Sequence, residues 1–131
     1  MTAAALPLDP YLFLRRTLFA DAASCAAMGL ALVLLGEPLA PYLGIQASLL
    51  QIAGASLLPV AAFMAWVATR ELPAFGAWLV IAGNAAWIAG SIAVLVLASP
   101  SALGYAFVIG QALVVAILAE LEYAGIRRAA A

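Results

Sequence analysis

Three polar side chains lie inside otherwise apolar stretches and are the first candidates for chemistry: Asp21, Asn84 and Glu120. On helices, Asp21 and Glu120 each extend a face of small residues, and Asn84 adjoins a similar stripe. In lipid, small-residue faces mark helix–helix contacts, so we expect the three side chains to face the interior of a helix bundle. Two carboxylates and an amide placed together can bind a cation or relay protons from one side of a membrane.

The same residues have a structural alternative. Asp21 and Glu120 each lie about one turn inside the expected cytoplasmic edge of the membrane, where an ionisable group costs less than the roughly 2.5–3.5 kcal/mol of mid-membrane burial. They would then pair with Arg70, Arg127 or a backbone N–H and tie helix ends together. A relay across the membrane also needs acidic residues in the other half of the helices, and the sequence places none there.

Further polar contacts are expected inside the membrane at Gln51, Gln111 and Trp87. A buried amide should bond to a neighbouring helix, and the indole N–H of Trp87 needs an acceptor. Pro59 interrupts the second apolar stretch and removes one i→i−4 hydrogen bond, so we expect a kink there. Such a kink either forms part of a ligand site or follows the curvature that packing requires.

Composition argues against other chemistry. The chain contains no histidine, its five basic residues are all arginine, and its single cysteine is Cys25. Neither Ser24 nor Ser91 has a histidine or lysine to activate it. We find no phosphate-binding, dinucleotide-binding or zinc-binding motif. With a net charge of −1 the chain has no basic field for nucleic acid. We therefore predict no enzyme activity, no cofactor, no metal and no nucleic-acid partner.

Four apolar stretches must position the candidate residues. They cover residues 18–35, 49–68, 74–98 and 102–119, and Asp21 is their only charged residue. About 18 apolar residues are enough for a helix to cross roughly 30 Å of hydrocarbon. The chain is 69% hydrophobic and 8% charged, with a mean hydropathy of +1.20. The sequence therefore predicts an all-α, polytopic membrane protein with one domain over residues 1–131.

Turn-forming residues set the expected helix limits. Asp9-Pro10 and Ser99-Pro100 each combine a capping side chain with a proline suited to a first helical turn. Gly36 and the prolines after it should end the first helix. We expect helices over residues 10–35, 46–69, 73–98 and 100–125. Links this short favour an antiparallel up-down-up-down bundle.

The arginines predict the orientation of this bundle. All five flank the helices on one side, and the two links on the other side have neither lysine nor arginine. The positive-inside rule then places both termini in the cytoplasm of a bacterial inner membrane. The two halves also correspond in part, because Asp21-Ala22-Ala23 falls where Asn84-Ala85-Ala86 falls in the second half. A duplication of a two-helix unit is one explanation, and the easy matching of alanine-rich and leucine-rich helices is the other.

Several short patterns carry a resemblance that covers nearly the whole chain. They are Asp21-Ala22, Leu57-Leu58-Pro59, Gly83-Asn84-x-x-Trp87, Leu103-Gly104-x-Ala106-Phe107-Val108-x-x-Gln111-Ala112 and Tyr123-x-Gly125-x-Arg127-Arg128. The sequence resembles a group of small, four-helix bacterial integral membrane proteins that is uncharacterised. The resemblance implies a bacterial origin and the same topology, and it brings no activity.

Three functions remain open at this point. The first is a small structural or accessory membrane protein that contacts lipids and forms a homo-oligomer or joins other membrane subunits. The second is a small transporter or ion-conducting protein that uses Asp21, Asn84 and Glu120. The third is a binder of lipid or quinone in a crevice beside Pro59 and Trp87. A tightly packed interior would argue against the third.

Overall fold

The computed structural model describes residues 8–131 of the chain, so the first seven residues of the expected domain lie outside the described part. It contains four α-helices: α1 (Leu12–Leu43), α2 (Ala47–Ala68), α3 (Ala74–Leu97) and α4 (Ala102–Ala130). All four are long and apolar enough to cross a membrane. The described residues form no strand. The predicted all-helical class is therefore confirmed, together with four candidate membrane spans.

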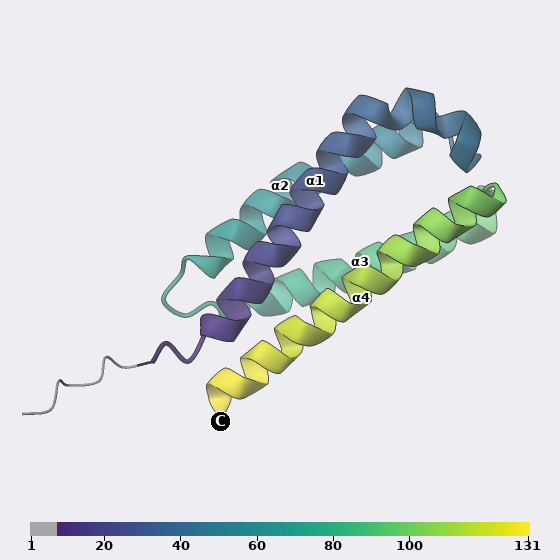
Figure 1. Cartoon of the computed structure of the whole chain (residues 1–131). Helices are drawn as coiled ribbons and strands as arrows, with labels where there is room; N and C mark the ends of the chain where they lie inside the picture. The colour runs from purple at the N-terminus through teal and green to yellow at the C-terminus, as the bar shows by residue number, and fades with distance from the viewer. Residues whose placement is uncertain (1–7) are drawn as a thin grey trace, which may run out of the picture.

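The first helix is longer than the sequence predicts. It continues through Pro38 and Pro41 and ends at Leu43, where Gly44 adopts the left-handed conformation with φ 65° and donates its N–H to the Ala40 carbonyl. A proline inside a helix removes one hydrogen bond and bends the axis without necessarily ending it. The last turns of α1 accordingly bend away from its first part (Figure 1). The expected end at Gly36 was wrong because that glycine serves packing: an added Cβ would lie 2.8 Å from Gln51 Cγ.

The fourth helix and the helix starts also differ from the expected limits. Helix α4 runs to Ala130 rather than to residue 125, and both proline-marked helices start two residues late. Asp9 still accepts the Tyr11 backbone N–H at 2.9 Å, in a turn that precedes α1. The side chain that caps α4 belongs to Ser101, which accepts the Gly104 N–H at 3.1 Å.

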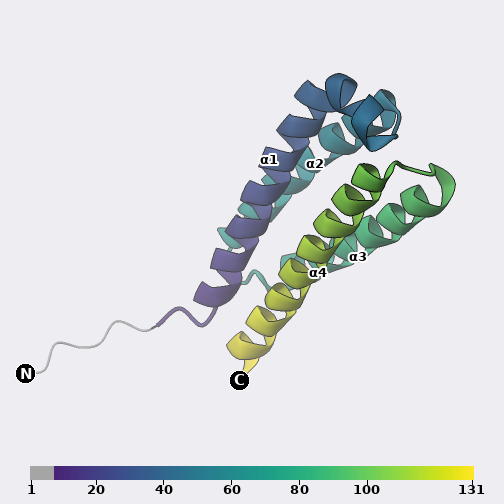
Figure 2. The same ribbon diagram turned by 45° about the vertical axis from the view of Figure 1, so that its right-hand side comes forward.

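The helices are arranged as two pairs. Helix α1 packs along α2 and α3 along α4, and α1 also contacts α4, whereas α2 and α3 barely touch. Figure 2 shows the two pairs next to each other. Within the first pair the backbones approach closely, since a Cβ on Gly54 would lie 2.8 Å from the Gly29 carbonyl oxygen. Such contacts between small residues are the usual means of helix association in lipid.

The end of the molecule opposite the chain termini is closed by the links between helices. The Leu43 carbonyl accepts the Ser101 N–H at 3.0 Å, and Ser101 Oγ donates to the Tyr42 carbonyl at 2.6 Å. Gly104 lies against Leu43 so closely that a side chain has no room there. These contacts attach the α3–α4 link to the end of α1 and so join the two pairs at this end.

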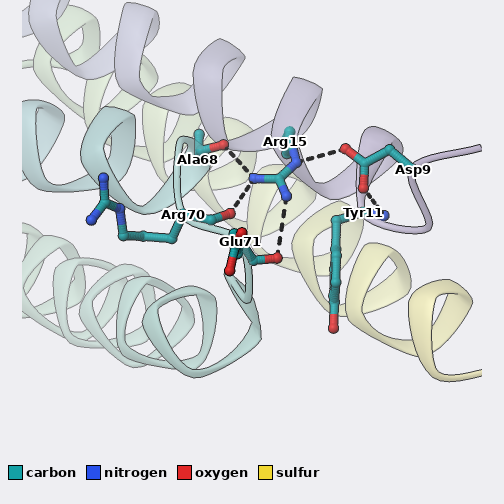
Figure 3. A network of polar contacts seen from close by, with 6 residues as sticks. All are labelled: Asp9, Tyr11, Arg15, Ala68, Arg70 and Glu71. Carbon is teal, nitrogen blue, oxygen red and sulfur yellow. Dashed lines mark hydrogen bonds and ion pairs between the residues drawn. The ribbon is translucent and has the colours of Figure 1, made fainter.

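Arg15 joins elements at the other end of the molecule (Figure 3). Its guanidinium donates to the Ala68 carbonyl at 2.8 Å, to the Arg70 carbonyl and to the Glu71 carbonyl at 3.3 Å. The same group forms an ion pair of 2.7 Å with Asp9. A cation beside the last carbonyls of a helix satisfies acceptors that have no partner within the helix. Arg15 therefore fastens the start of α1 to the end of α2 and to the link that follows.

Two groups of buried apolar side chains form the core. The larger lies toward the termini and includes Leu14, Leu18 and Met64, and the smaller lies toward the opposite end and includes Leu32 and Leu50. Met28 packs against both groups.

Candidate functional site

A cluster of three polar side chains lies between the two helix pairs. Asn84 of α3 donates from Nδ2 to Asp21 Oδ2 of α1 at 3.0 Å and to Glu122 Oε1 of α4 at 3.2 Å. Asp21 and Glu122 are fully buried, and Asn84 is 5% exposed. Two carboxyl groups thus converge on one amide nitrogen, away from water. We call these three residues the acid–amide cluster.

The first turns of α1 supply the remaining contacts of Asp21. Cys25, one turn further along, donates from Sγ to Asp21 Oδ1 at 3.5 Å, and Ser24 Oγ donates to the Asp21 carbonyl at 2.9 Å. Glu122 Oε2 is buried and has no hydrogen-bond partner among the described residues. A buried carboxyl oxygen without a partner is costly, so this oxygen has unused capacity for a proton, a hydrogen-bond donor or a positive charge.

The structure brings Asp21 and Asn84 together but excludes Glu120, which is exposed. Glu122 takes the expected place of Glu120, because two residues correspond to about 200° around a helix and thus to opposite faces. The small residues before Glu120, Ala112 and Ala116, lie at intervals of four from it and so indicated the wrong face of α4. The face of α4 that is actually buried follows Gly104, Val108, Glu122 and Gly125. Glu122 lies eighteen residues after Gly104, which is five full turns of 3.6 residues, whereas Glu120 lies sixteen residues after Gly104 and therefore on another side of the helix.

The proposed pairing of the acids with arginines is also wrong for Asp21. Its side-chain oxygens accept from Asn84 and Cys25, and the only ion pair within residues 8–131 joins Arg15 to Asp9. The Arg70 guanidinium instead lies over the Trp66 ring, 4.8 Å from its centroid. Arg127 forms no ion pair with a carboxylate of residues 8–131. The acid–amide cluster therefore has no arginine to balance its charge.

A second polar group connects α3 to α4 one turn deeper. Trp87 Nε1 donates to Gln111 Oε1 at 2.7 Å, so the indole and the amide are each other's partners. Gln111 Nε2 donates to Ser91 Oγ and to the Val108 carbonyl, both at 2.9 Å. Ser91 Oγ in turn donates to the Trp87 carbonyl at 2.9 Å. These bonds hold the Trp87 ring in one orientation between the helix pairs.

The other two candidates of the sequence have different surroundings. Gln51 is half-buried and packs at the close approach of α2 to Gly36. Pro59 is exposed, and α2 continues through it from Ala47 to Ala68. Pro59 itself lines no cavity, but Leu57 and Val60 on either side of it line one together with Trp87. A cavity therefore lies beside both Trp87 and the segment of α2 that contains the proline.

Two apolar cavities lie between the helix pairs, and both are lined by Met28, Gly83, Trp87 and Gln111 among others. The first, with a volume of about 440 Å³, reaches Ser91 and the apolar side chains of α2, and we call it the Ser91 cavity. The second, of about 500 Å³, reaches Asn84, Cys25 and Ser24, and we call it the Asn84 cavity. No acidic side chain lines either cavity, but Asp21 lies directly behind Asn84 and Cys25.

Glycines make room for these cavities. A Cβ added at Gly83, Gly90 or Gly110 would meet no atom within 4 Å, and all three residues line a cavity. Gly29 and Gly54, in contrast, are in tight contact with each other's helix. The small residues of the chain thus fall into two sets, one that packs helices together and one that leaves space between them.

The described residues hold no group of three or more His, Cys, Asp or Glu that could bind a metal ion. Ser24 and Ser91 donate to backbone carbonyls and have no basic side chain to activate them. Compared with protein-family models, curated proteins and solved structures, the chain matches none of them. Function must therefore be inferred from the geometry of the site.

Proposed function

We propose that this chain is an integral membrane protein that binds a largely apolar, lipid-like molecule between its two helix pairs. The two cavities beside Trp87 carry this proposal. Their volumes of about 440 and 500 Å³ fall in the range of small-molecule sites, and their lining is mostly apolar with a few fixed polar groups. The proposal includes no catalytic step.

The proposed orientation of the chain follows from its arginines. The four helices cross a bacterial inner membrane as an antiparallel up-down-up-down bundle, with both termini and the Arg70 link in the cytoplasm. In this orientation the acid–amide cluster lies near the cytoplasmic ends of α1 and α4, and Trp87 lies deeper. The cavities are then at the level of the acyl chains, where an apolar molecule can enter from the bilayer.

Other proposals have less support from the geometry. Large apolar side chains are exposed along all four helices, and lipid contact explains them as well as an oligomer does. A structural or accessory role also gives no reason for glycines that leave open space at the centre. A pathway for ions would need charged groups along its length, whereas no acidic side chain lines either cavity.

Fluorescence quenching by a brominated ligand tests the proposal. Trp66→Phe with Trp78→Phe leaves Trp87 as the only tryptophan, and Trp78→Phe with Trp87→Phe leaves Trp66, which is 54% exposed and lines neither cavity. The probe is dodecanol carrying bromine halfway along its chain, added to protein in phosphatidylcholine nanodiscs. Trp66 reports the probe dissolved in bulk lipid. We expect quenching of Trp87 to exceed that of Trp66 and to saturate.

A cavity-filling variant provides the decisive comparison. Gly83 lines both cavities and has open space around it, so Gly83→Leu should occupy the site without disturbing a helix contact. Ala85→Leu is the matched control, because Ala85 is exposed on the same helix and lines neither cavity. Gly83→Leu should abolish the saturable quenching and Ala85→Leu should keep it. Equal, unsaturable quenching of Trp87 and Trp66 would overturn the proposal.

A further inference from the structure

We infer that the natural occupant of the Asn84 cavity is an amphipathic amine, whose ammonium head binds beside Asn84 and whose chain lies along Trp87. This inference rests on the proposed function and deepens it by naming the chemical class of the ligand. Two independent features of the site carry it: the hydrogen-bonding groups that the cavity leaves free, and the uncompensated charge behind its wall.

The first feature is that every polar hydrogen lining the Asn84 cavity is already used. Six side chains with polar hydrogens line it, namely Ser24, Cys25, Ser56, Asn84, Trp87 and Gln111. The two serine hydroxyls donate to backbone carbonyls, the cysteine thiol to Asp21, and the indole to Gln111. Both amide groups place their Nδ2 or Nε2 hydrogens on two acceptors each. The cavity has no free side-chain donor to offer.

Acceptors, in contrast, remain available. Because the Asn84 nitrogen lies between two carboxyl groups, its carbonyl oxygen is the part of the amide left for a ligand. The hydroxyl oxygen of Ser24 also keeps lone pairs after its hydrogen is used. A ligand head that only accepts, such as a quinone carbonyl, a carboxylate or a phosphate, would find no partner and would lose its hydration. The head must therefore donate, as an ammonium or a hydroxyl group does.

The second feature is that the acid–amide cluster has no cationic partner among residues 8–131. Asp21 and Glu122 are fully buried, no arginine pairs with either among residues 8–131, and Glu122 Oε2 has no donor. Asp21 lies one side chain behind the cavity wall, in contact with both Asn84 and Cys25. Attraction between opposite charges is strong in such low-dielectric surroundings. Two converging carboxyl groups that share one proton keep one negative charge. A positive head at Asn84 supplies a countercharge for it, which a neutral hydroxyl cannot do.

The test compares two probes that differ only in the head group. They are dodecylamine and dodecanol, each brominated halfway along the chain, and the amine is protonated at pH 7 because alkyl amines titrate near pH 10. Quenching is measured in the Trp87-only protein in phosphatidylcholine nanodiscs. The Trp66-only protein corrects for the different partitioning of the two probes. We expect the amine to saturate at a concentration about tenfold below that of the alcohol, because the cost of removing the ammonium from water offsets much of its attraction to the buried acids.

Charge variants then locate the origin of this preference. Asp21→Asn with Glu122→Gln should make the two probes equal while leaving saturable binding of the alcohol. Glu120→Gln is the matched control, since it removes one carboxylate from the same part of α4 at an exposed position, and it should keep the preference. Melting temperatures check that each variant is folded. If the double variant does not fold, the comparison of the amine with the alcohol in the Trp87-only protein, whose acid–amide cluster is unaltered, still tests the inference.

The outcomes separate this inference from the proposed function. Saturable binding of both probes at equal concentration means that a proton, and not a ligand, compensates the cluster, and it overturns the amine assignment while the apolar site stands. Loss of the preference in Glu120→Gln would likewise overturn the inference, because it would assign the effect to surface charge. Quenching that saturates for neither probe overturns both proposals.

Discussion

Asn84 donates to Asp21 across the centre of the molecule at 3.0 Å, and the two residues are also matching positions of the two halves of the sequence. Asp21 is followed by Ala22-Ala23 on α1, as Asn84 is followed by Ala85-Ala86 on α3. If the halves are a repeat, matching residues can meet only next to the axis that relates them. One half contributes a carboxylate there and the other an amide, so the pair forms a hydrogen bond where two carboxylates would repel each other.

Exchanging the two residues tests this relationship. Asn84→Asp brings three carboxyl groups together without a donor between them and should destabilise the protein by about 3 kcal/mol or more. Adding Asp21→Asn restores one amide among two carboxyl groups and should recover most of the loss. Thermal unfolding in detergent, followed by circular dichroism, measures both effects. If Asp21→Asn instead destabilised the Asn84→Asp protein further, the result would contradict a hydrogen bond between the two residues.

Hydropathy was sufficient to predict four helices that are long and apolar enough to cross a membrane, whereas their ends depended on three-dimensional context. Pro38 and Pro41 indicate a break in sequence, but both fit within the bent end of α1. Gly36 and Gly44 look equivalent in sequence. Only the structure shows that the first makes room for Gln51 and that the second takes the left-handed conformation which ends the helix.

The candidate site was predictable where a polar residue stood out in an apolar stretch. Asp21 and Asn84 are conspicuous because almost nothing polar surrounds them, and the structure brings them together. The choice between Glu120 and Glu122 required the correct phase of α4, which alanine spacing did not give. The role of Arg15 could not be read from a pattern, since its partners are backbone carbonyls of a distant segment.

Tight packing of α1 on α2 should depend on Gly54. Gly54→Ala places a Cβ 2.7 Å from Leu32 Cβ and 2.8 Å from the Gly29 carbonyl oxygen, so the helices must separate. We expect a loss of about 1–3 kcal/mol in thermal unfolding, as for other overpacked positions. Gly110→Ala is the control, because no atom lies within 4 Å of its Cβ. It should be neutral or stabilising by up to about 1 kcal/mol, since alanine favours a helix over glycine. Equal effects of the two substitutions would contradict a close helix contact at Gly54.

Removing the guanidinium of Arg15 should loosen the end of the molecule that carries the termini. Arg15→Gln loses three bonds to backbone carbonyls and the ion pair with Asp9. We expect a destabilisation of about 1.5–3 kcal/mol, the usual range for charged hydrogen bonds that are partly buried. Arg16→Gln is the matched control, because it removes the same charge from an exposed neighbour. If the two variants had the same melting temperature, Arg15 would act only through its charge.

Acid should release the contacts of Asp9, which precedes the first span. The Tyr11 backbone N–H and, second, the Arg15 guanidinium stabilise the ionised carboxyl and lower its pKa below the usual 3.8. A lowered folded-state pKa means that these contacts stabilise the protein fully above the unfolded value and are lost as pH falls through the folded one. Hydrogen exchange of a peptide containing Tyr11 should therefore accelerate below about pH 4 relative to Asp9→Asn, which lacks the titrating group. Parallel exchange in the two proteins at every pH would exclude this contribution.

The arginine distribution makes the orientation in the membrane testable. Cys25→Ser removes the buried native thiol and retains a donor to Asp21. In that background, Gln46→Cys introduces a thiol in the arginine-free link after α1, and Ala131→Cys introduces one after Arg127 and Arg128. An impermeant maleimide added to intact bacterial cells should label the first variant at once and the second only after permeabilisation, because arginine-rich segments stay in the cytoplasm. Labelling of both variants in intact cells would mean that the chain inserts in two orientations. The acid–amide cluster would then face both sides of the membrane, and ligand entry could not be assigned to one side.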